Sequence, residues 1–134
     1  MKDEFKAITL EWIKKGQSDY GFANAAFREF DDFYSQMCIL CHDASEKFLK
    51  GFIASYGTRP ERTHDLLNLL DICIKLGQNT KSLVELGPCC KTLNQYYTPL
   101  KSPSHFPTMT KDQAQEALEA ARIIKKIILG YLKL

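Results

Sequence analysis

The sequence of 134 residues has no apolar run near the roughly 20 residues that a membrane-spanning helix needs. It also lacks an excess of charge of one sign, because its formal net charge is only +2. The first residues, MKDEFKAITLEWIKK, mix both charges and contain no secretory hydrophobic segment. We therefore expect a cytoplasmic protein with no membrane contact, in which any anion site is a local patch.

An even number of cysteines is also missing: there are five, so they cannot all pair within the chain. Without an export segment, this number favours reduced thiols over a disulfide framework. Cys38-Ile39-Leu40-Cys41-His42 matches the C-x-x-C-H pattern of covalent haem attachment, and a zinc site that adds Cys89 and Cys90 is conceivable. Such haem attachment requires export, and adjacent cysteines point in different directions on a helix. We therefore expect core thiols, no metal and no cofactor.

Proline is scarce, and three of the five prolines lie in the segment 98–109, which predicts a long loop there. The proline-free stretch 37–55 carries its apolar residues on two neighbouring stripes, which predicts a central helix with at least two helical neighbours. Its charged residues form one polar edge, with acid-to-base pairs expected between Asp43 and Lys47 and between Glu46 and Lys50.

Helical spacing of apolar residues continues on both sides of this segment. It predicts a first helix from about 3 to 28, in which Gly16 marks a bend or a close approach of a neighbour. Asp31-Asp32 is expected to cap the central helix, and a short helix is expected over 65–76. Residues 80–97 are expected to form one helix kinked at Pro88, and Thr110 with Gln113 predicts a capping box before the last helix. The expected architecture is all-α, a single domain over 1–134 built as an antiparallel up-and-down four-helix bundle with one additional short helix.

Arg59, Arg62 and His64 lie together before the short helix. Arginine donates paired hydrogen bonds to phosphate, histidine exchanges a proton near neutral pH, and the backbone amides at a helix start bind anions. These residues are thus candidates for phosphate binding. In the simpler alternative, His64 caps the short helix and both arginines are solvated.

A second candidate group lies in and just before the proline-rich loop. Lys101 and His105 of the loop can contact phosphate, while Tyr97 before it stacks on a base. Alternatively, Tyr97 belongs to the core and the loop is simply exposed. His42, on the edge of the central helix, is expected to be structural.

Several segments together resemble the HEPN (higher eukaryotes and prokaryotes nucleotide-binding) family. Ala44-Ser45-Glu46-Lys47-Phe48-Leu49-Lys50 resembles its A-x-E-K-x-L-K signature, and Thr63-His64-Asp65-Leu66 resembles its T-H-D-L turn. Its first and last helices are matched by Trp12-Ile13, Asp19-Tyr20 and Ala23, and by Ala114, Ala117, Leu118 and Ala121.

The resemblance implies a helical bundle that forms homodimers, binds a nucleotide or RNA, and accompanies a small nucleotidyltransferase in a toxin–antitoxin-like pair. Active members of the family are metal-independent RNases that use an arginine and a histidine beside the last helix. Here Tyr97 and Pro103 match the family pattern before that helix, but Lys101 replaces the arginine, with His105 after it. Lysine keeps the charge but loses the planar fork. The resemblance thus implies a binding module or, alternatively, an RNase with Lys101 and His105 as catalytic residues. A purely structural interaction subunit is a further alternative.

Overall fold

The structure, a computed structural model, describes residues 1–97 and 108–133, and these residues form helices and no strand. The helices are α1 (Asp3–Glu29), α2 (Tyr34–Ser55), α3 (Leu66–Leu76), α4 (Lys81–Val84), α5 (Gly87–Asn94) and α6 (Lys111–Leu132). The predicted all-α bundle is confirmed. Among the described residues, none of the helices combines the length and apolar character needed to cross a bilayer.

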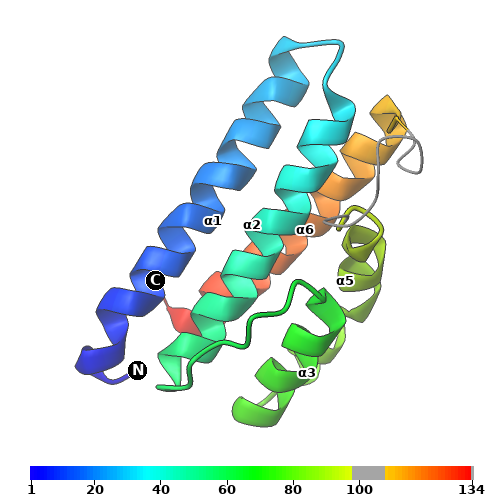
Figure 1. Ribbon diagram of the computed structural model, residues 1–134. Helices are drawn as coiled ribbons and strands as arrows, with labels where there is room; N and C mark the ends of the chain where they lie inside the picture. The colour runs from blue at the N-terminus through cyan, green and yellow to red at the C-terminus, as the bar shows by residue number, and fades with distance from the viewer. Residues whose placement is uncertain (98–107, 134) are drawn as a thin grey trace.

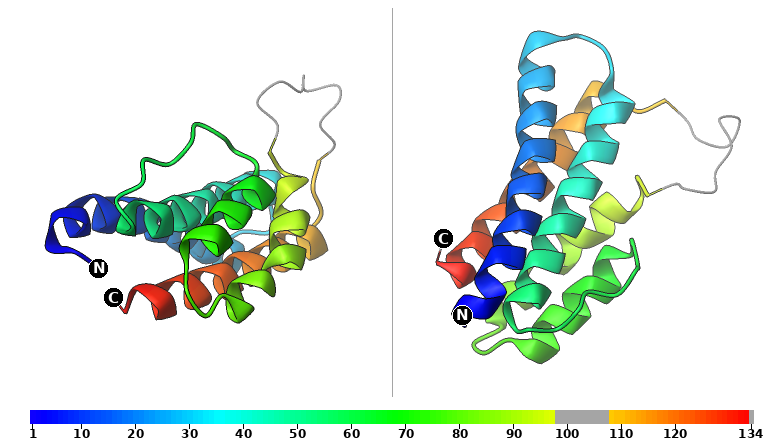
Figure 2. Two further views of the ribbon diagram at one scale, coloured as in Figure 1. Left: turned by 90° about the horizontal axis from the view of Figure 1, so that it is seen from below. Right: turned by 60° about the vertical axis from the view of Figure 1, so that its left-hand side comes forward.

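The three long helices form one side of the molecule, and the shorter helices α3, α4 and α5 form the other (Figures 1 and 2). Helices α1 and α2 make an antiparallel hairpin, whereas α6 runs alongside α2 in the same direction. At the start of both helices, the Met109 amide donates to Ser35 Oγ over 2.9 Å. At their ends, the rings of Phe52 and Tyr131 lie 5.8 Å apart. This parallel pairing is possible because the chain returns through α3 to α5 before α6 begins.

Helix α2 is the centre of the core, as its two apolar stripes predicted. The buried residues on it include Met37, Cys38, Cys41, Ala44, Phe48, Leu49, Phe52 and Ile53. The cysteines are free, and all but the half-buried Cys89 are buried, which confirms their expected role in packing. Burial raises the pKa of Cys38 to about 11, so this thiol is protonated near neutral pH.

Two expectations about helix boundaries are wrong. Residues 80–97 form two helices, and Pro88 lies in the first turn of α5, where its missing N–H leaves no hydrogen bond unmade. The expected apolar stripe is nevertheless kept, because Leu83 and Leu93 are both buried. The carboxylate of Asp32 accepts from the Phe33 amide, and the N-cap of α2 is Phe33 itself, in a left-handed conformation with φ 68°.

The expected capping box of α6 is confirmed. The Thr110 side chain accepts a hydrogen bond from the Gln113 amide, while the Gln113 side chain accepts one from the Thr110 amide. These two bonds satisfy backbone donors that the first helical turn leaves without partners.

Candidate functional site

The candidate site begins on the polar edge of α2, where Glu46 and Lys50 stand one helical turn apart. Lys50 Nζ lies 3.0 Å from Glu46 Oε2, which confirms the predicted ion pair. The two residues are only 8% and 7% exposed, so this edge is covered rather than solvated. The predicted pair between Asp43 and Lys47 is wrong, because Lys47 is bonded to Asp19 of α1 instead. An acid and a base buried together satisfy one another, since either alone would be costly to desolvate.

His64 covers this pair from the connection between α2 and α3. Its Nδ1 lies 2.7 Å from Glu46 Oε1, so both carboxylate oxygens of Glu46 have partners. The His64 carbonyl oxygen lies 2.8 Å from Nε2 of the buried His42. Helix α2 therefore holds the connection at two points, one through the side chain of His64 and one through its backbone.

Aromatic stacking extends this group toward the end of α5. The Tyr97 ring stacks with that of His64 at 4.8 Å between centroids and with that of His42 at 5.4 Å. Tyr97 is the last described residue before the segment 98–107. The half-buried Tyr97 ring therefore connects the end of α5 to both imidazoles.

The local fold of the α2–α3 connection depends on Asp65, which is the N-cap of α3. Its carboxylate accepts hydrogen bonds from the Leu67 and Asn68 amides, and from the Asn94 side chain of α5 over 2.9 Å. The hydrogen bond from Asn94 is the largest cause that lowers the Asp65 pKa, followed by the two backbone amides. The alternative in which His64 caps the short helix is therefore wrong by one residue.

On the other side of Lys50 lies a pocket of about 440 Å³ between α1, the end of α2 and the α2–α3 connection. Its lining residues are Phe5, Ile8, Trp12, Lys50, Ala54, Gly57, Thr58, Arg59, Pro60, Glu61 and Arg62. Lys50 Nζ sits 5.6 Å from the centre of the Trp12 ring, within the range of a cation–π contact. The pocket thus combines an aromatic wall with three cationic residues, Lys50, Arg59 and Arg62, and one acidic residue, Glu61.

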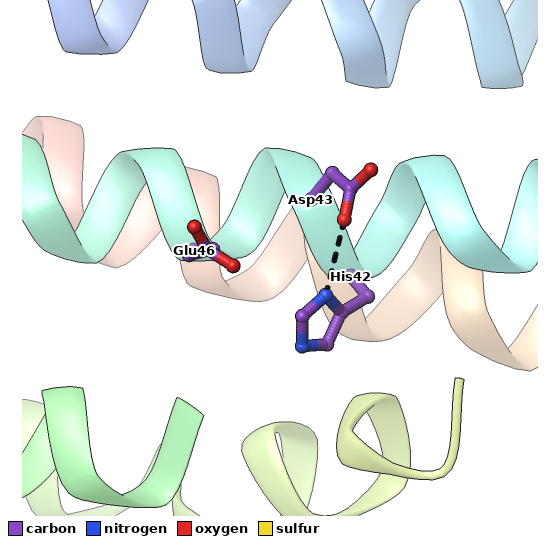
Figure 3. A group of neighbouring side chains, drawn as sticks. All are labelled: His42, Asp43 and Glu46. Carbon is purple, nitrogen blue, oxygen red and sulfur yellow. Dashed lines mark hydrogen bonds and ion pairs between the residues drawn. The ribbon is translucent and has the colours of Figure 1, made fainter. Parts of the chain in front are cut away.

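A neighbouring group of His42, Asp43 and Glu46 has three possible metal-ligand atoms within 4.8 Å of one another (Figure 3). Figure 3 shows His42 projecting from α2 toward α3 and α5, with Asp43 bonded to its Nδ1. The Glu46 carboxylate is already occupied by Lys50 and His64. Because an ammonium group 3.0 Å from that carboxylate repels a cation, the arrangement favours an ion-pair network over a metal centre.

Comparison with known proteins agrees with this fold and with the signature on α2. The model of the HEPN domain family matches residues 9–131. The chain belongs to the HEPN family. The crystal structure of TT1696 from Thermus thermophilus superposes with a TM-score of 0.74 at 23% identity, covering 92% of this chain and 97% of that one. The structure of ST0689, an archaeal HEPN homologue, gives 0.66 at 22% identity, with coverage of 91% and 95%. A search of curated proteins found no match.

The structure of this HEPN domain separates the predicted site residues into two groups. Arg59 and Arg62 line the pocket, whereas His64 turns to Glu46 and joins Tyr97. Lys101 and His105 lie outside the described residues, and their role stays a prediction.

Sequence reasoning misses three residues of the site, namely Trp12, Glu46 and Lys50. Helical periodicity places Trp12 on the core stripe of the first helix, and the other two on a polar edge of the central helix. The HEPN-like signature on α2, which contains both Glu46 and Lys50, is the signal that marks this edge as special.

Proposed function

We propose that this HEPN domain binds a nucleotide or the phosphate groups of RNA in the pocket beside α2. The observation that carries the proposal is the convergence of Trp12, Lys50, Arg59 and Arg62 on one cavity. Guanidinium groups form paired hydrogen bonds with phosphate oxygens, and an indole ring is a platform on which a base stacks. Tyr97 and His64 extend the site, with Lys101 and His105 as further phosphate contacts.

The size and shape of the pocket support a small ligand or a single-stranded end. Its volume of about 440 Å³ falls within the range of sites that take small molecules. The cationic side chains line a concave pocket, whereas a double-stranded RNA is recognised across an extended surface. A mononucleotide or one nucleotide of a single strand therefore fits best.

Calorimetry with ATP, GTP and a short single-stranded RNA tests this proposal. We expect the double change of Arg59→Ala and Arg62→Ala to weaken binding by about tenfold or more, since each removed guanidinium contacts phosphate. Arg28→Ala is the matched control, because Arg28 is exposed on α1 near the α1–α2 turn and outside the pocket. Lys101→Ala is also expected to weaken binding, and wild-type affinity should fall as salt rises. If none of the three ligands gives heat with the wild type, the proposal is wrong.

A metal-independent RNase is the alternative, favoured by membership of the HEPN family and by Tyr97, which leads directly into the segment with Lys101 and His105. In this mechanism His105 takes the proton of a ribose 2′-OH and Lys101 stabilises the charge on phosphate. The 2′-oxygen attacks phosphorus and the bond from phosphorus to the 5′-oxygen breaks. That oxygen takes a proton from water and leaves as a 5′-hydroxyl, which gives a 2′,3′-cyclic phosphate. Cleavage of single-stranded RNA in EDTA that disappears in His105→Ala would support it, whereas cleavage that survives in this variant would rule it out.

The proposal includes a homodimer and a small nucleotidyltransferase as protein partner in a toxin–antitoxin-like pair. Helix α6 supports the first of these, because its exposed charges after Lys111, whose ammonium lies over the Phe27 ring, are divided by sign. Asp112, Glu116 and Glu119 lie in its first half, Arg122 and Lys126 lie in its second half, and Lys133 follows at its end. Two copies of α6 that pack antiparallel would place opposite charges face to face.

A subunit that only binds proteins is the remaining alternative. Co-elution with a nucleotidyltransferase, without any response to nucleotide or RNA, would favour it.

A further inference from the structure

Three large aromatic side chains are exposed where α1 turns into α2. Phe22, Phe30 and Phe33 are 67%, 50% and 50% exposed. Single exposed apolar residues are ordinary, but a cluster of three phenylalanines on a small domain marks a contact surface. We call these three residues the Phe surface.

The Phe surface encloses a pocket of about 290 Å³ rather than lying flat. Its lining residues are Phe22, Ala26, Phe30, Phe33, Gln36, Met37 and Leu40, so Gln36 supplies the only polar side chain among them. A pocket with this lining accepts an apolar group, and its size suits one or two large side chains rather than a nucleotide with its charged phosphates.

The backbone holds this surface in place at an energetic cost. Phe33 has φ 68°, a left-handed conformation that bulky residues rarely adopt. Its ring meets that of Phe30 edge to face, with centroids 5.4 Å apart. The hydrogen bond between Met109 and Ser35 ties the following turn of α2 to the start of α6. The rings are therefore presented by a fixed framework, which reduces the ordering needed when a partner binds.

The charge around the Phe surface indicates which partner fits. Glu29, Asp31 and Asp32 are exposed in the same turn, with Arg28 as the one opposing charge between residues 28 and 33. A second copy of this chain, related by a two-fold axis, would bring the same carboxylates against one another. A partner with basic residues beside its apolar ones meets attraction instead.

We propose that the Phe surface docks an amphipathic helix of a different protein. One large apolar side chain of that helix enters the pocket, and flanking lysines or arginines face Glu29, Asp31 and Asp32. This mode of recognition, a helix laid into an apolar groove with charges at its rim, is common among peptide-binding domains.

Docking there leaves the nucleotide pocket open, because the two sites lie at opposite ends of the α1–α2 hairpin. The Phe surface adjoins the start of α2, and the pocket with Arg59 and Arg62 adjoins its end at Ala54 and Gly57. Figure 1 shows the course of α2 between these two ends. The nearest lining residues on α2, Leu40 of the Phe surface pocket and Lys50 of the other, are ten residues apart, or about 15 Å along the helix axis. A failure to bind nucleotide would therefore not contradict the proposed docking of a helix.

A pair of labelled peptides tests the proposal by fluorescence anisotropy on the whole chain. Each is an amphipathic helix of about 16 residues with Leu and Phe on one face. One peptide carries lysines beside that face, and the other carries glutamates. We expect the lysine peptide to bind the wild type about tenfold or more tightly than the glutamate peptide, and this preference should shrink in high salt.

Variants of the protein identify the surface that is used. Phe22→Ser and Phe30→Ser should each weaken the lysine peptide by about tenfold, as expected for aromatic residues at the centre of an interface. Val84→Ser, which removes an exposed apolar side chain on α4, is the matched control and should leave affinity unchanged. Asp31→Lys should reduce the preference for the lysine peptide. Circular dichroism melting should show that the variants remain folded, since the altered side chains are exposed.

Three results would overturn the proposal: no binding of the lysine peptide, equal binding of both peptides, or unchanged affinity in Phe22→Ser and Phe30→Ser. Sedimentation velocity supplies a further check. If the wild type self-associates and Phe22→Ser alone abolishes this, the occupant is a second copy and the proposed partner is wrong.

Discussion

Glu46 and Lys50 lie between the two parts of the site, and together they contact both. Glu46 accepts from Lys50 on one oxygen and contacts His64 with the other, while Lys50 lies over the Trp12 ring in the pocket beside α2. A phosphate in that pocket would compete with Glu46 for the Lys50 ammonium. A phosphate that draws Lys50 away would leave His64 as the remaining partner of the Glu46 carboxylate.

We predict that Glu46→Ala lowers the free energy of unfolding by about 3 kcal/mol, because it leaves the Lys50 ammonium buried without a counter-charge. Replacing both residues by leucine should cost less than Glu46→Ala alone, since no charge then remains unpaired. Urea unfolding of the variants measures both effects. Glu11→Ala is the control, because Glu11 and Lys15 form an i,i+4 pair of the same kind that is solvent-exposed and worth less than about 1 kcal/mol. Equal losses at Glu46 and Glu11 would contradict the prediction.

The α1–α2 hairpin is held by a close contact at Gly16. A Cβ atom at this position would lie 2.8 Å from Phe48 Cε1 and 3.1 Å from the Ala44 carbonyl oxygen. Helix α1 continues through Gly16, which selects the close approach over the bend as the reason for this glycine. The packing of the central helix against its first neighbour therefore depends on a missing side chain.

Gly16→Ala is expected to destabilise the protein by about 1–3 kcal/mol, as overpacking does in a filled core. Gly21→Ala lies on the same helix, where a Cβ would meet nothing within 4 Å. That variant should gain up to about 1 kcal/mol, because alanine is the better helix former. Thermal unfolding should give shifts of opposite sign, and a stabilised Gly16→Ala variant would refute the close contact.

The N-cap of α3 gives a prediction with a pH dependence. Asp65→Ala should cost about 1 kcal/mol near neutral pH, the usual value of such a cap. Hydrogen bonds from Asn94 and two backbone amides lower the Asp65 pKa below its ordinary 3.8. The stabilisation is therefore complete above that ordinary value and disappears as the pH falls through the lower pKa of the folded state. Urea titrations across acidic pH should show wild type and variant converging. A difference that persists in strong acid would count against the carboxylate as its source.

At the scale of the whole molecule, the division of charge along α6 predicts how two copies associate. Lys126→Glu should weaken the homodimer, because it places like charges opposite Glu119 in an antiparallel α6 pair. Adding Glu119→Lys to this variant should restore association by exchanging the two signs. Sedimentation velocity over a range of protein concentrations measures both. If Lys126→Glu leaves the homodimer affinity unchanged, the dimer uses another surface. A wild-type protein that is monomeric would contradict the α6 pairing.

Sequence periodicity alone determined that this chain is helical, where most of its helices lie and which face of α2 is buried. These properties follow from local spacing and capping, as the capping box at Thr110 and the buried stripe from Leu83 to Leu93 demonstrate. The tertiary structure decided which polar residues belong to the site. Charges four residues apart, such as Glu46 and Lys50, have the same spacing whether water or another segment covers them. The paths of α1 and of the α2–α3 connection bury this pair and place His64 on one side of it and the arginine-lined pocket on the other.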